Sequence, residues 1–246
     1  MSHPFDLTGR TVLVTGATSG LGRQTALSIA EMGGRVVITG RRGELLAQTL
    51  GELAGEGHAV CTADLTLPED RERLVGQLPP LDGIAHCAGI TLLHPFKFSD
   101  EARFHQVYAI NVEAPFFLTQ KILKERRLQN EGSIVFVSSL APFTGTKGHS
   151  IYAGSKASVI ALARVLAHEL APSRIRANSI APAMVKTAVV EGFIQQVSPE
   201  RAASDEARYP LGYGEPRDVA NAIVFFLSSA SKWITGSNLI MDAGLT

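Results

Sequence analysis

Near its start the chain passes from an apolar run through a glycine-rich turn into a helical pattern. The apolar run is TVLVT at 11–15, the turn is GATSGLG at 16–22, and the helical pattern is RQTALSIAEMGG at 23–34. Glycine lets the backbone turn tightly and approach a ligand, while the free N–H groups and positive dipole end of a helix attract a pyrophosphate. The pattern predicts a nucleotide-binding unit of an α/β protein, with a tight turn without a ligand as the alternative.

Six more apolar runs follow, and helical patterns separate most of them. The runs lie at 35–39, 58–64, 82–87, 133–138, 175–180 and 237–242. Strands that alternate with helices form parallel sheets with right-handed crossovers. We therefore predict an α/β fold: a single Rossmann-type, doubly wound domain over 1–246, with a seven-stranded parallel sheet and helices on both faces.

Two other segments bear on function. Apolar spacing predicts one helix over 99–128, and Asn111 interrupts its apolar stripe. A buried amide needs hydrogen-bond partners, so Asn111 either satisfies backbone groups or orders water beside a site. The weaker, mixed-charge pattern of about 188–210 indicates a substrate lid, with a plain surface excursion as the alternative.

Charge and composition argue against several classes of partner. Lysine plus arginine equals aspartate plus glutamate at 23 each, so no net charge attracts nucleic acid or an anionic membrane. No apolar run approaches the roughly 20 residues of a spanning helix, and histidine and cysteine do not occur at metal-ligand spacing. Both cysteines lie in strand-like runs, which is typical of reduced, buried thiols. We expect a cytoplasmic protein that binds no nucleic acid, no membrane and no catalytic metal.

The ends of the predicted strands carry residues suited to a dinucleotide. Arg41 and Arg42 follow the second strand, where an acidic residue favours NAD. Two arginines instead offer contacts to a 2′-phosphate and favour NADP, unless they only solvate the loop. Asp64 ends the third run, where it would accept a hydrogen bond from the adenine amino group or cap the next helix. Ala88 and Gly89 follow the fourth run and are small enough to admit a nicotinamide ribose.

A hydroxyl, a phenol and an ammonium occur together in the stretch 138–156. Tyr152 and Lys156 are four residues apart, so on a helix they share one face, and a fixed cation favours the phenolate form of tyrosine. Ser139 follows the fifth run, where a loop would hold its hydroxyl in a cleft near a substrate carbonyl. Taken alone, a tyrosine and a lysine at this spacing also fit a solvated surface pair.

Together these motifs closely resemble the short-chain dehydrogenase/reductase family, in its compact single-domain branch. The matching residues span essentially the whole chain and are TGATSGLG at 15–22, Asp64, AG at 88–89, Asn111, Ser139, YAGSK at 152–156, NSIAP at 178–182, Thr187, and ITG and MDAG near the end. The resemblance implies that Tyr152 is the general acid/base, that Lys156 lowers its pKa and binds the nicotinamide ribose, and that Ser139 holds the carbonyl oxygen. It also implies that Asn111 supports a water-linked proton relay.

The resemblance extends to the cofactor contacts. Arg41 takes the place typical of NADP-preferring members, and Gly40 stands where NAD users carry aspartate. NADP is therefore expected in preference to NAD. The expected cofactor-binding residues are Gly16, Thr18, Ser19, Gly20, Leu21, Arg41, Arg42, Asp64, Leu65, Ala88, Gly89, Tyr152, Lys156, Pro182, Val185 and Thr187.

Three features depart from the family pattern. Cys87 stands where the family carries asparagine, Ala183 replaces the usual glycine after the proline, and PLGYGEP at 210–216 is one residue shorter than the common form. None of them involves the proton-transfer residues. We expect altered local packing or pocket shape and retained activity.

The expected function is reduction of a ketone by NADPH, or oxidation of the secondary alcohol, with Tyr152 as general acid/base. The alternative is a cofactor-sensing binding or regulatory protein that kept the fold without catalysis. Among enzymes, a 3-oxoacyl thioester reductase and a reductase of sugar, steroid or secondary-metabolite ketones stay open. The candidate pocket residues indicate a hydrophobic ketone unless they are core, and they are His94, Phe96, Phe143, His149, Met184 and Phe193.

The expected partners are a small-molecule carbonyl substrate and further copies of the chain. Family members commonly pair through two long helices, here near 99–128 and 151–171, so the resemblance implies a homotetramer or homodimer. A basic cluster near a helix end would suit an acidic acyl carrier protein, or form a solvated face. Its members are Lys124, Arg126, Arg127 and Arg174.

Overall fold

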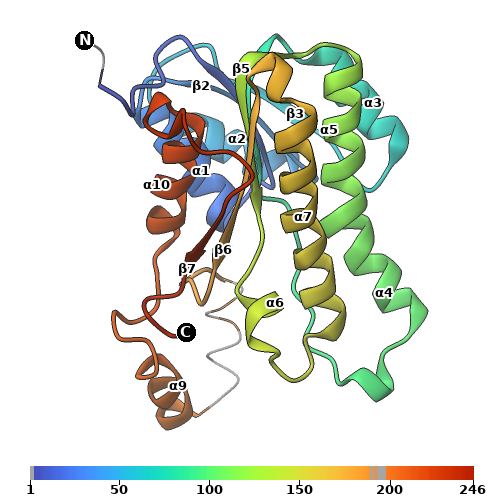
Figure 1. Cartoon of the computed structure of the whole chain (residues 1–246), viewed down its shortest axis with the longest axis vertical. Helices are drawn as coiled ribbons and strands as arrows, with labels where there is room; N and C mark the ends of the chain where they lie inside the picture. The colour runs from blue at the N-terminus through green and yellow to red at the C-terminus, as the bar shows by residue number, and fades with distance from the viewer. Residues whose placement is uncertain (1–2, 189, 191, 193–197) are drawn as a thin grey trace.

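One sheet of parallel strands runs through the centre of the computed structural model, which describes residues 3–188, 190, 192 and 198–246 (Figure 1). Its seven strands lie in the order β3-β2-β1-β4-β5-β6-β7, and every neighbouring pair is parallel. The strands are β1 (Thr11–Thr15), β2 (Arg35–Gly40), β3 (Ala59–Thr62), β4 (Leu81–His86), β5 (Leu128–Val137), β6 (Arg176–Pro182) and β7 (Asn238–Met241). The predicted doubly wound, seven-stranded parallel sheet is confirmed.

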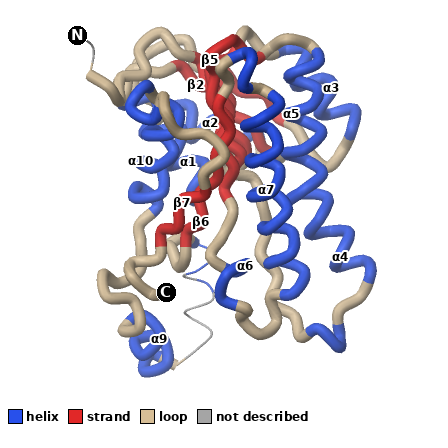
Figure 2. Tube along the Cα trace, viewed as in Figure 1, coloured by secondary structure: helices blue, strands red, loops and turns tan. Residues whose placement is uncertain are grey.

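Helices cover both faces of this sheet, as Figure 2 shows. One face carries α1 (Gly20–Glu31), α2 (Gly43–Gly51) and α10 (Pro216–Leu227), and the other carries α3 (Pro68–Gln77), α5 (Ala114–Lys124) and α7 (Ser150–Glu169). The shorter described helices are α4 (Glu101–Tyr108), α6 (Ala141–Thr144) and α9 (Pro199–Glu206), with a π-helical turn η2 (Ala109–Glu113) and the 3₁₀ turns η1 (Phe96–Phe98), η3 (Ala171–Ser173) and η4 (Ser229–Ser231).

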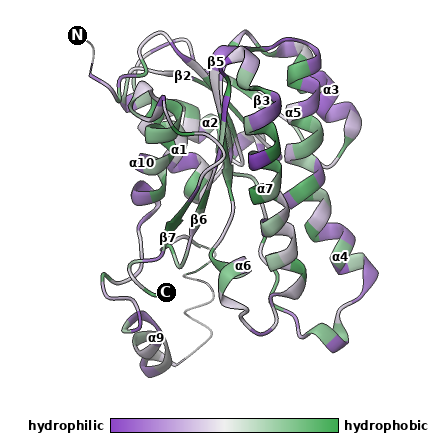
Figure 3. Ribbon diagram, viewed as in Figure 1, coloured by the Kyte–Doolittle hydropathy of each residue, from purple (hydrophilic) through white to green (hydrophobic). Residues whose placement is uncertain are grey.

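The strands are buried on both faces, which explains their continuous apolar sequences. Val12 and Val14 of β1 pack in the core cluster that includes α1 and α10, whereas Leu13 between them packs in the cluster that includes α5 and α7. Successive side chains of a strand point to opposite faces, so a strand between two helical layers is apolar at every position. Figure 3 shows green, hydrophobic residues on the helices that lie beside the sheet, such as α7, whereas α3 is mostly purple, that is, hydrophilic.

The parallel arrangement brings the carboxyl ends of the strands to one edge of the sheet, beside α6 in Figure 1. The glycine turn at 16–22 follows β1, Ala88 and Gly89 follow β4, and Ser139 follows β5. Ligands of open α/β sheets bind at this edge. The fold therefore gathers the predicted site residues from distant parts of the chain.

The prediction of one helix over 99–128 is wrong. The structure divides this segment into α4, the π-helical turn η2 and α5, and β5 already begins at Leu128. Pro115 supplies the reason, because a proline lacks the N–H donor and its ring clashes with the carbonyl four residues earlier, which here belongs to Asn111. The wider π turn accommodates that carbonyl, and such turns are frequent at functional sites.

The predicted lid at about 188–210 is described only in part. Residues 189, 191 and 193–197 lie outside the described residues, and so does the pocket residue Phe193. The described part contains α9, which an ion pair of 3.2 Å between Lys186 Nζ and Glu206 Oε1 joins to the chain after β6. Closure of this segment over a site stays a prediction.

Candidate active site

The glycine turn lies in close backbone contact with the end of β4. Gly16 has a positive φ of 68°, and a Cβ placed on it would lie 2.8 Å from the Cα of Ala88. A Cβ on Gly22 would lie 2.4 Å from the carbonyl oxygen of Gly16, so the first turn of α1 also presses on the loop. Any larger side chain at these positions displaces backbone. The two glycines are therefore required to bring the loop, α1 and β4 together.

The buried Thr15 binds the backbone at the end of β4 beside the glycine turn. The Thr15 hydroxyl oxygen accepts hydrogen bonds from the N–H groups of Cys87 and Ala88, each at 3.1 Å. On the other side of the turn, a Cβ on Gly20 would lie 3.6 Å from Cγ2 of Thr187, so the chain after β6 reaches the glycine turn as well. Predicted cofactor residues from three separate segments thus form one continuous surface.

The start of α1 fits a pyrophosphate. Ser19 is the N-cap residue, and its side chain makes no capping hydrogen bond, so no side chain competes for the N–H groups of the first turn. The Arg42 guanidinium donates to the Thr18 hydroxyl at 2.9 Å and to the Ser19 hydroxyl at 3.4 Å, which places a cation beside the turn. Arg41 is exposed and has no hydrogen bond or ion pair with the described residues.

The end of β2 leaves little room for an acidic side chain. A Cβ on Gly40 would lie 2.9 Å from Cγ2 of Thr18. An aspartate at this position would therefore push against the glycine turn, whereas the side chain of the following Arg41 is exposed. The local packing agrees with the absence of the NAD-type acidic residue.

Asp64 does not cap a helix. The N-cap of α3 is Leu67, so the capping alternative for Asp64 is wrong. Its Oδ1 instead accepts hydrogen bonds from the Thr66 N–H at 3.0 Å and the Thr66 hydroxyl at 2.7 Å. This turn fixes the carboxylate at the carboxyl edge of the sheet and leaves Oδ2 without a partner among the described residues. The neighbouring Leu65 side chain is buried in the core, so only its backbone faces the edge.

Tyr152 and Lys156 lie on α7 against the end of β5. The Lys156 ammonium donates to the Val137 carbonyl at 2.9 Å, and the Ser138 hydroxyl donates to the Lys156 carbonyl at 2.8 Å. Ser139 follows directly, and its side chain lies close enough to Tyr152 to lower the pKa of the phenol. The serine, tyrosine and lysine therefore form one packed group, and the reading of Tyr152 and Lys156 as a solvated surface pair is wrong because Lys156 is only 7% exposed.

Burial dominates the acid–base properties of this group. It raises the pKa of the Tyr152 phenol, and the hydrogen bond with Ser139 acts in the opposite direction. It also lowers the pKa of the Lys156 ammonium to about 8. The resemblance implied that Lys156 lowers the tyrosine pKa, but Nζ lies 5.9 Å from the centre of the Tyr152 ring and donates to Val137 instead. In this structure the phenol is protonated at neutral pH.

Asn111 satisfies backbone groups, the first of its two predicted roles. Its side-chain oxygen accepts from the Ile90 N–H at 2.9 Å, and its amide donates to the Ile90 carbonyl at 2.9 Å and the Ser155 hydroxyl at 3.0 Å. A Cβ on Gly89 would lie 3.0 Å from the Asn111 oxygen and 3.1 Å from Lys156 Nζ. The glycine therefore allows the loop after β4 to pass both side chains.

His86 is a polar residue of the site that the sequence analysis missed. Its Nε2 lies 2.8 Å from the Thr119 hydroxyl, its ring stacks on Phe136 at 4.9 Å, and burial lowers its pKa to about 3. With Asn111 and Lys156 it lines a cavity of about 10 Å³, enough for about one water molecule. A histidine inside the apolar run DGIAHC was the available signal.

The departure at Cys87 affects packing alone. Its Sγ lies 3.8 Å from the Thr25 hydroxyl of α1, and burial raises the pKa of the thiol to about 12. A thiol with such a pKa is not a nucleophile at neutral pH. Both cysteines of the chain are free thiols.

The remaining candidate pocket residues follow the carboxyl ends of β4, β5 and β6, and the segments 93–98 and 143–149 are called the mouth of the candidate site. Phe96 and Phe143 are 80% and 51% exposed, so neither is a core residue. The His94 ring nitrogen Nε2 lies 2.9 Å from the Phe98 carbonyl oxygen, and Met184 is half-buried beside the β6 end. His149 lies next to Tyr152, with ring centres 5.6 Å apart.

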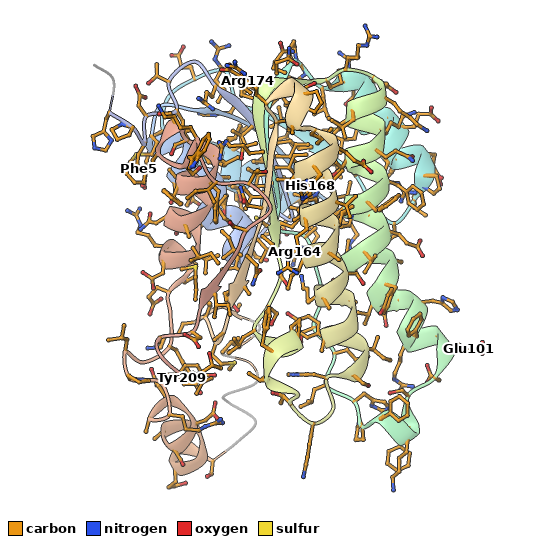
Figure 4. The ribbon with its side chains drawn as sticks, viewed as in Figure 1. Phe5, Glu101, Arg164, His168, Arg174 and Tyr209 are labelled. Atoms are coloured by element: carbon orange, nitrogen blue, oxygen red, sulfur yellow. The ribbon has the colours of Figure 1, made fainter. Side chains whose placement is uncertain are left out.

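The basic cluster lies far from these residues. Arg126 and Arg127 precede β5 and Arg174 precedes β6, so all three lie at the amino-terminal edge of the parallel sheet. Figure 4 shows Arg174 near the top of the molecule, and Tyr209, close to α9, near the bottom. Arg174 pairs with Glu131 at 3.3 Å. Within one chain, this cluster and the candidate site occupy opposite ends.

Two other kinds of site were considered in the sequence: a metal centre and a membrane-spanning helix. Among the described residues, no three histidine, cysteine or acidic side chains gather where they could hold a metal ion. In the same part of the chain, no helix combines the length and apolar character needed to cross a bilayer.

Similarity to known proteins extends over the same region. The family model described as "Enoyl-(Acyl carrier protein) reductase" matches residues 16–246. The 3-oxoacyl-[acyl-carrier-protein] reductase FabG of Rickettsia bellii is 33% identical over 245 residues, which cover 98% of each chain. D-erythrulose reductase of Gallus gallus is 32% identical over 246 residues, covering 99% of this chain and 98% of that protein.

A solved structure of the angucycline C-6 ketoreductase LanV with bound NADP has a TM-score of 0.89 and 26% identity, covering 98% of this chain and 96% of that one. The sheet, the order of the site residues along it and these full-length matches agree with one another. The chain therefore belongs to the short-chain dehydrogenase/reductase family, whose members use nicotinamide cofactors to oxidise or reduce alcohol and carbonyl groups.

Proposed function

We propose that this protein is an NADPH-dependent ketone reductase in which Tyr152 is the general acid. The observation that carries the proposal is that Tyr152 lies beside Ser139 on one side of α7 and shares that helix with the buried Lys156. A carbonyl oxygen that accepts hydrogen bonds from both hydroxyls has its developing negative charge stabilised by Ser139 while Tyr152 supplies the proton. Because burial raises its pKa, Tyr152 holds this proton at neutral pH, which favours the reducing direction.

Reduced NADP, when bound, supplies the hydride that the carbonyl carbon receives. The residues of this chain fit such a cofactor: glycine at 16, 22 and 89 lets the turn, α1 and the loop after β4 pack closely, and the first turn of α1 has no side-chain cap competing for its N–H groups. Lys156 lies beside Gly89, where its ammonium would meet a ribose hydroxyl. After proton transfer, Lys156 and the small cavity lined by Asn111 and His86 offer a route by which Tyr152 regains its proton.

The preference for NADP over NAD rests on Arg41 and Arg42. A guanidinium binds a phosphate through two parallel hydrogen bonds, and Arg41 is exposed with no competing partner among the described residues. Arg42 already bonds to Thr18 and Ser19, so it shapes the turn as well as adding charge.

The rival function is a cofactor-sensing protein without catalysis. A sensor needs the glycine turn but has no use for a tyrosine placed beside a serine at the carboxyl edge. Among reductases, the relatives act on 3-oxoacyl thioesters, erythrulose and angucyclines according to their names, and the exposed Phe96 and Phe143 favour an apolar substrate. A homotetramer or homodimer stays a prediction, and sedimentation velocity tests it. The exposed side chains of Phe116, Phe117 and Val165 on α5 and α7 suit such contacts.

The test replaces Tyr152 with Phe. We expect Tyr152→Phe to lower kcat by at least about 100-fold for NADPH-dependent reduction across β-ketoacyl thioesters, diketones and cyclic ketones, because the proton donor is lost. NADPH binding, followed by fluorescence titration, should persist. Tyr108→Phe is the matched control, since the Tyr108 hydroxyl has no hydrogen bond with the described residues, and it should retain its turnover. Near-normal turnover of Tyr152→Phe would refute the role of Tyr152 as general acid. A wild-type protein that binds NADPH but reduces no ketone would support the cofactor-sensing function.

A further inference from the structure

His149 is held rigidly beside the catalytic tyrosine. It occupies the N-cap position of α7, three residues before Tyr152, and the two rings lie 5.6 Å apart at an angle of 60°. Its N–H donates to the Thr146 carbonyl at 3.2 Å, and its carbonyl accepts from the Ala153 N–H at 2.7 Å. The backbone of His149 is therefore bonded on both sides.

The preceding residue anchors the loop from outside. The Gly148 carbonyl accepts from the His94 N–H at 2.8 Å, and a Cβ on Gly148 would lie 2.8 Å from Cδ1 of Leu93. Gly148 also has a positive φ of 83°, which favours glycine. This contact joins the loop at 145–149 to the loop after β4, so His149 lies between the two loops that form the mouth of the site.

The fold leaves both ring nitrogens of His149 unused. Although His149 stands at the N-cap of α7, its side chain makes no capping hydrogen bond. Its Nδ1 is one of only two buried side-chain nitrogen or oxygen atoms without a partner among the described residues. Nε2 also has no partner there, but it is not buried. A helix cap therefore does not explain this histidine.

The buried nitrogen determines which tautomer is favoured. Unpaired buried N–H groups are rarer than under-satisfied acceptors, so the proton belongs on the accessible Nε2 and the lone pair on the buried Nδ1. Burial lowers the pKa of the imidazole, so the ring is neutral at neutral pH. His149 accordingly carries an uncharged, accessible N–H donor on a ring that lies beside Tyr152.

We propose that His149 is a specificity-determining residue whose Nε2–H donates a hydrogen bond to a second carbonyl oxygen of the substrate. The first carbonyl is the one reduced at Ser139 and Tyr152, so the inference rests on the proposed function. An uncharged, half-buried donor beside Tyr152 suits an ester, thioester or ketone oxygen, because a free carboxylate loses more hydration there than a neutral donor returns. The preferred substrates are thus ketones with a neutral carbonyl one or two bonds from the reacting carbon.

The experiment compares two substrates that differ in this oxygen alone. Ethyl 3-oxobutanoate carries an ester carbonyl, and 4-ethoxybutan-2-one has a methylene in its place. His149→Phe keeps an aromatic ring beside Tyr152 but removes the donor, and His149→Gln keeps an amide donor. Steady-state kcat and KM with NADPH are measured for the wild-type enzyme and both variants. Thermal unfolding and NADPH binding serve as controls for folding.

We expect His149→Phe to lower kcat/KM for the ester about tenfold, mainly through KM, because a hydrogen bond of this kind is worth about 1.4 kcal/mol. The value for the ether should stay within about twofold, since it loses no contact. His149→Gln should recover part of the preference. For each protein, kcat/KM for the ester is divided by kcat/KM for the ether. Comparing this ratio between the wild-type enzyme and a variant removes the intrinsic difference in reactivity between the two ketones.

Three results would overturn the inference. One is an equal loss for both substrates in a folded His149→Phe variant that binds NADPH, which indicates a packing role. Another is that both variants keep the wild-type ratio of kcat/KM for the ester to kcat/KM for the ether. The third is a wild-type enzyme that reduces other ketones but neither of this pair. If the wild-type enzyme reduces no ketone at all, the proposed function fails and the inference fails with it.

Discussion

Where the cofactor would bind, backbone lies directly on backbone. The turn at 16–22 presses on Ala88, and Gly22 of α1 presses on Gly16, so a Cβ added to Gly16 or Gly22 would lie less than 3 Å from backbone atoms. At the mouth of the candidate site, 93–98 and 143–149, the side chains of Phe96 and Phe143 are exposed instead. The first region has no space for variation, whereas side chains in the second can change with little cost to the fold.

The cofactor region is therefore suited to binding one ligand that is always the same. The mouth of the candidate site is suited to selecting among different substrates. Close backbone contacts position N–H groups and helix ends for a cofactor that is the same whatever the substrate. Loops with exposed side chains are where binding specificity varies on a constant scaffold. Lys156 lies where the two regions meet, because it borders Gly89 on one side and Tyr152 on the other.

The largest effect is expected at Gly22. Gly22→Ala places a Cβ 2.4 Å from the Gly16 carbonyl oxygen, so we expect it to abolish the native fold or to lower the free energy of unfolding by at least about 3 kcal/mol, with loss of NADPH binding. Urea denaturation measures the change. Gly76→Ala in α3 is the matched control, because its Cβ meets nothing within 4 Å, and it should raise the free energy by about 0.5 kcal/mol. Equal stability of the two variants would refute the claim that the turn has no space.

A smaller, pH-dependent effect is expected at Lys156. Burial lowers its pKa to about 8 in the folded chain, below its unfolded value. Below pH 8 the ammonium is charged in both states and its burial destabilises the fold fully; above that pH the folded chain loses the proton first, and the cost disappears. The free energy of unfolding of Lys156→Met minus that of the wild type should therefore be larger at pH 7 than at pH 10. We expect this difference to decrease by about 2 kcal/mol between the two pH values.

Urea denaturation of both proteins at the two pH values isolates this contribution, because all other titrations cancel between them. Both proteins are compared without cofactor. A difference that stays constant with pH would show that Lys156 titrates normally and is not buried as described.

The smallest of these effects is expected at Arg41, at the exposed rim of the cofactor region. Arg41→Ala should weaken NADPH binding about tenfold through loss of a charge-assisted contact to the 2′-phosphate, and it should leave NADH binding unchanged. Titrating both cofactors measures this ratio. Arg42→Ala is the comparison: because Arg42 also bonds to Thr18 and Ser19, it should weaken both cofactors. An equal loss of NADPH and NADH in Arg41→Ala would contradict the assigned cofactor preference.

Much of the fold could be predicted because its signals are local. Apolar runs such as 11–15 are continuous when both faces of a strand are buried, and the alternation with helices leads to a parallel sheet. The positions of Ser139, Tyr152 and Lys156 follow from a strand end and an i, i+4 spacing. The break at Asn111 was missed, although Pro115 four residues later was a readable sign.

The sequence by itself determined the order of the strands and helices, the glycine turn and the serine, tyrosine and lysine of the candidate site, since each depends on neighbours within a few residues. Only the tertiary structure decided the charge state of Tyr152, the burial of His86 beside Lys156 and the unpartnered nitrogen of His149. Burial and hydrogen-bond partners depend on segments that are distant along the chain. For that reason they become defined only when the segments pack together.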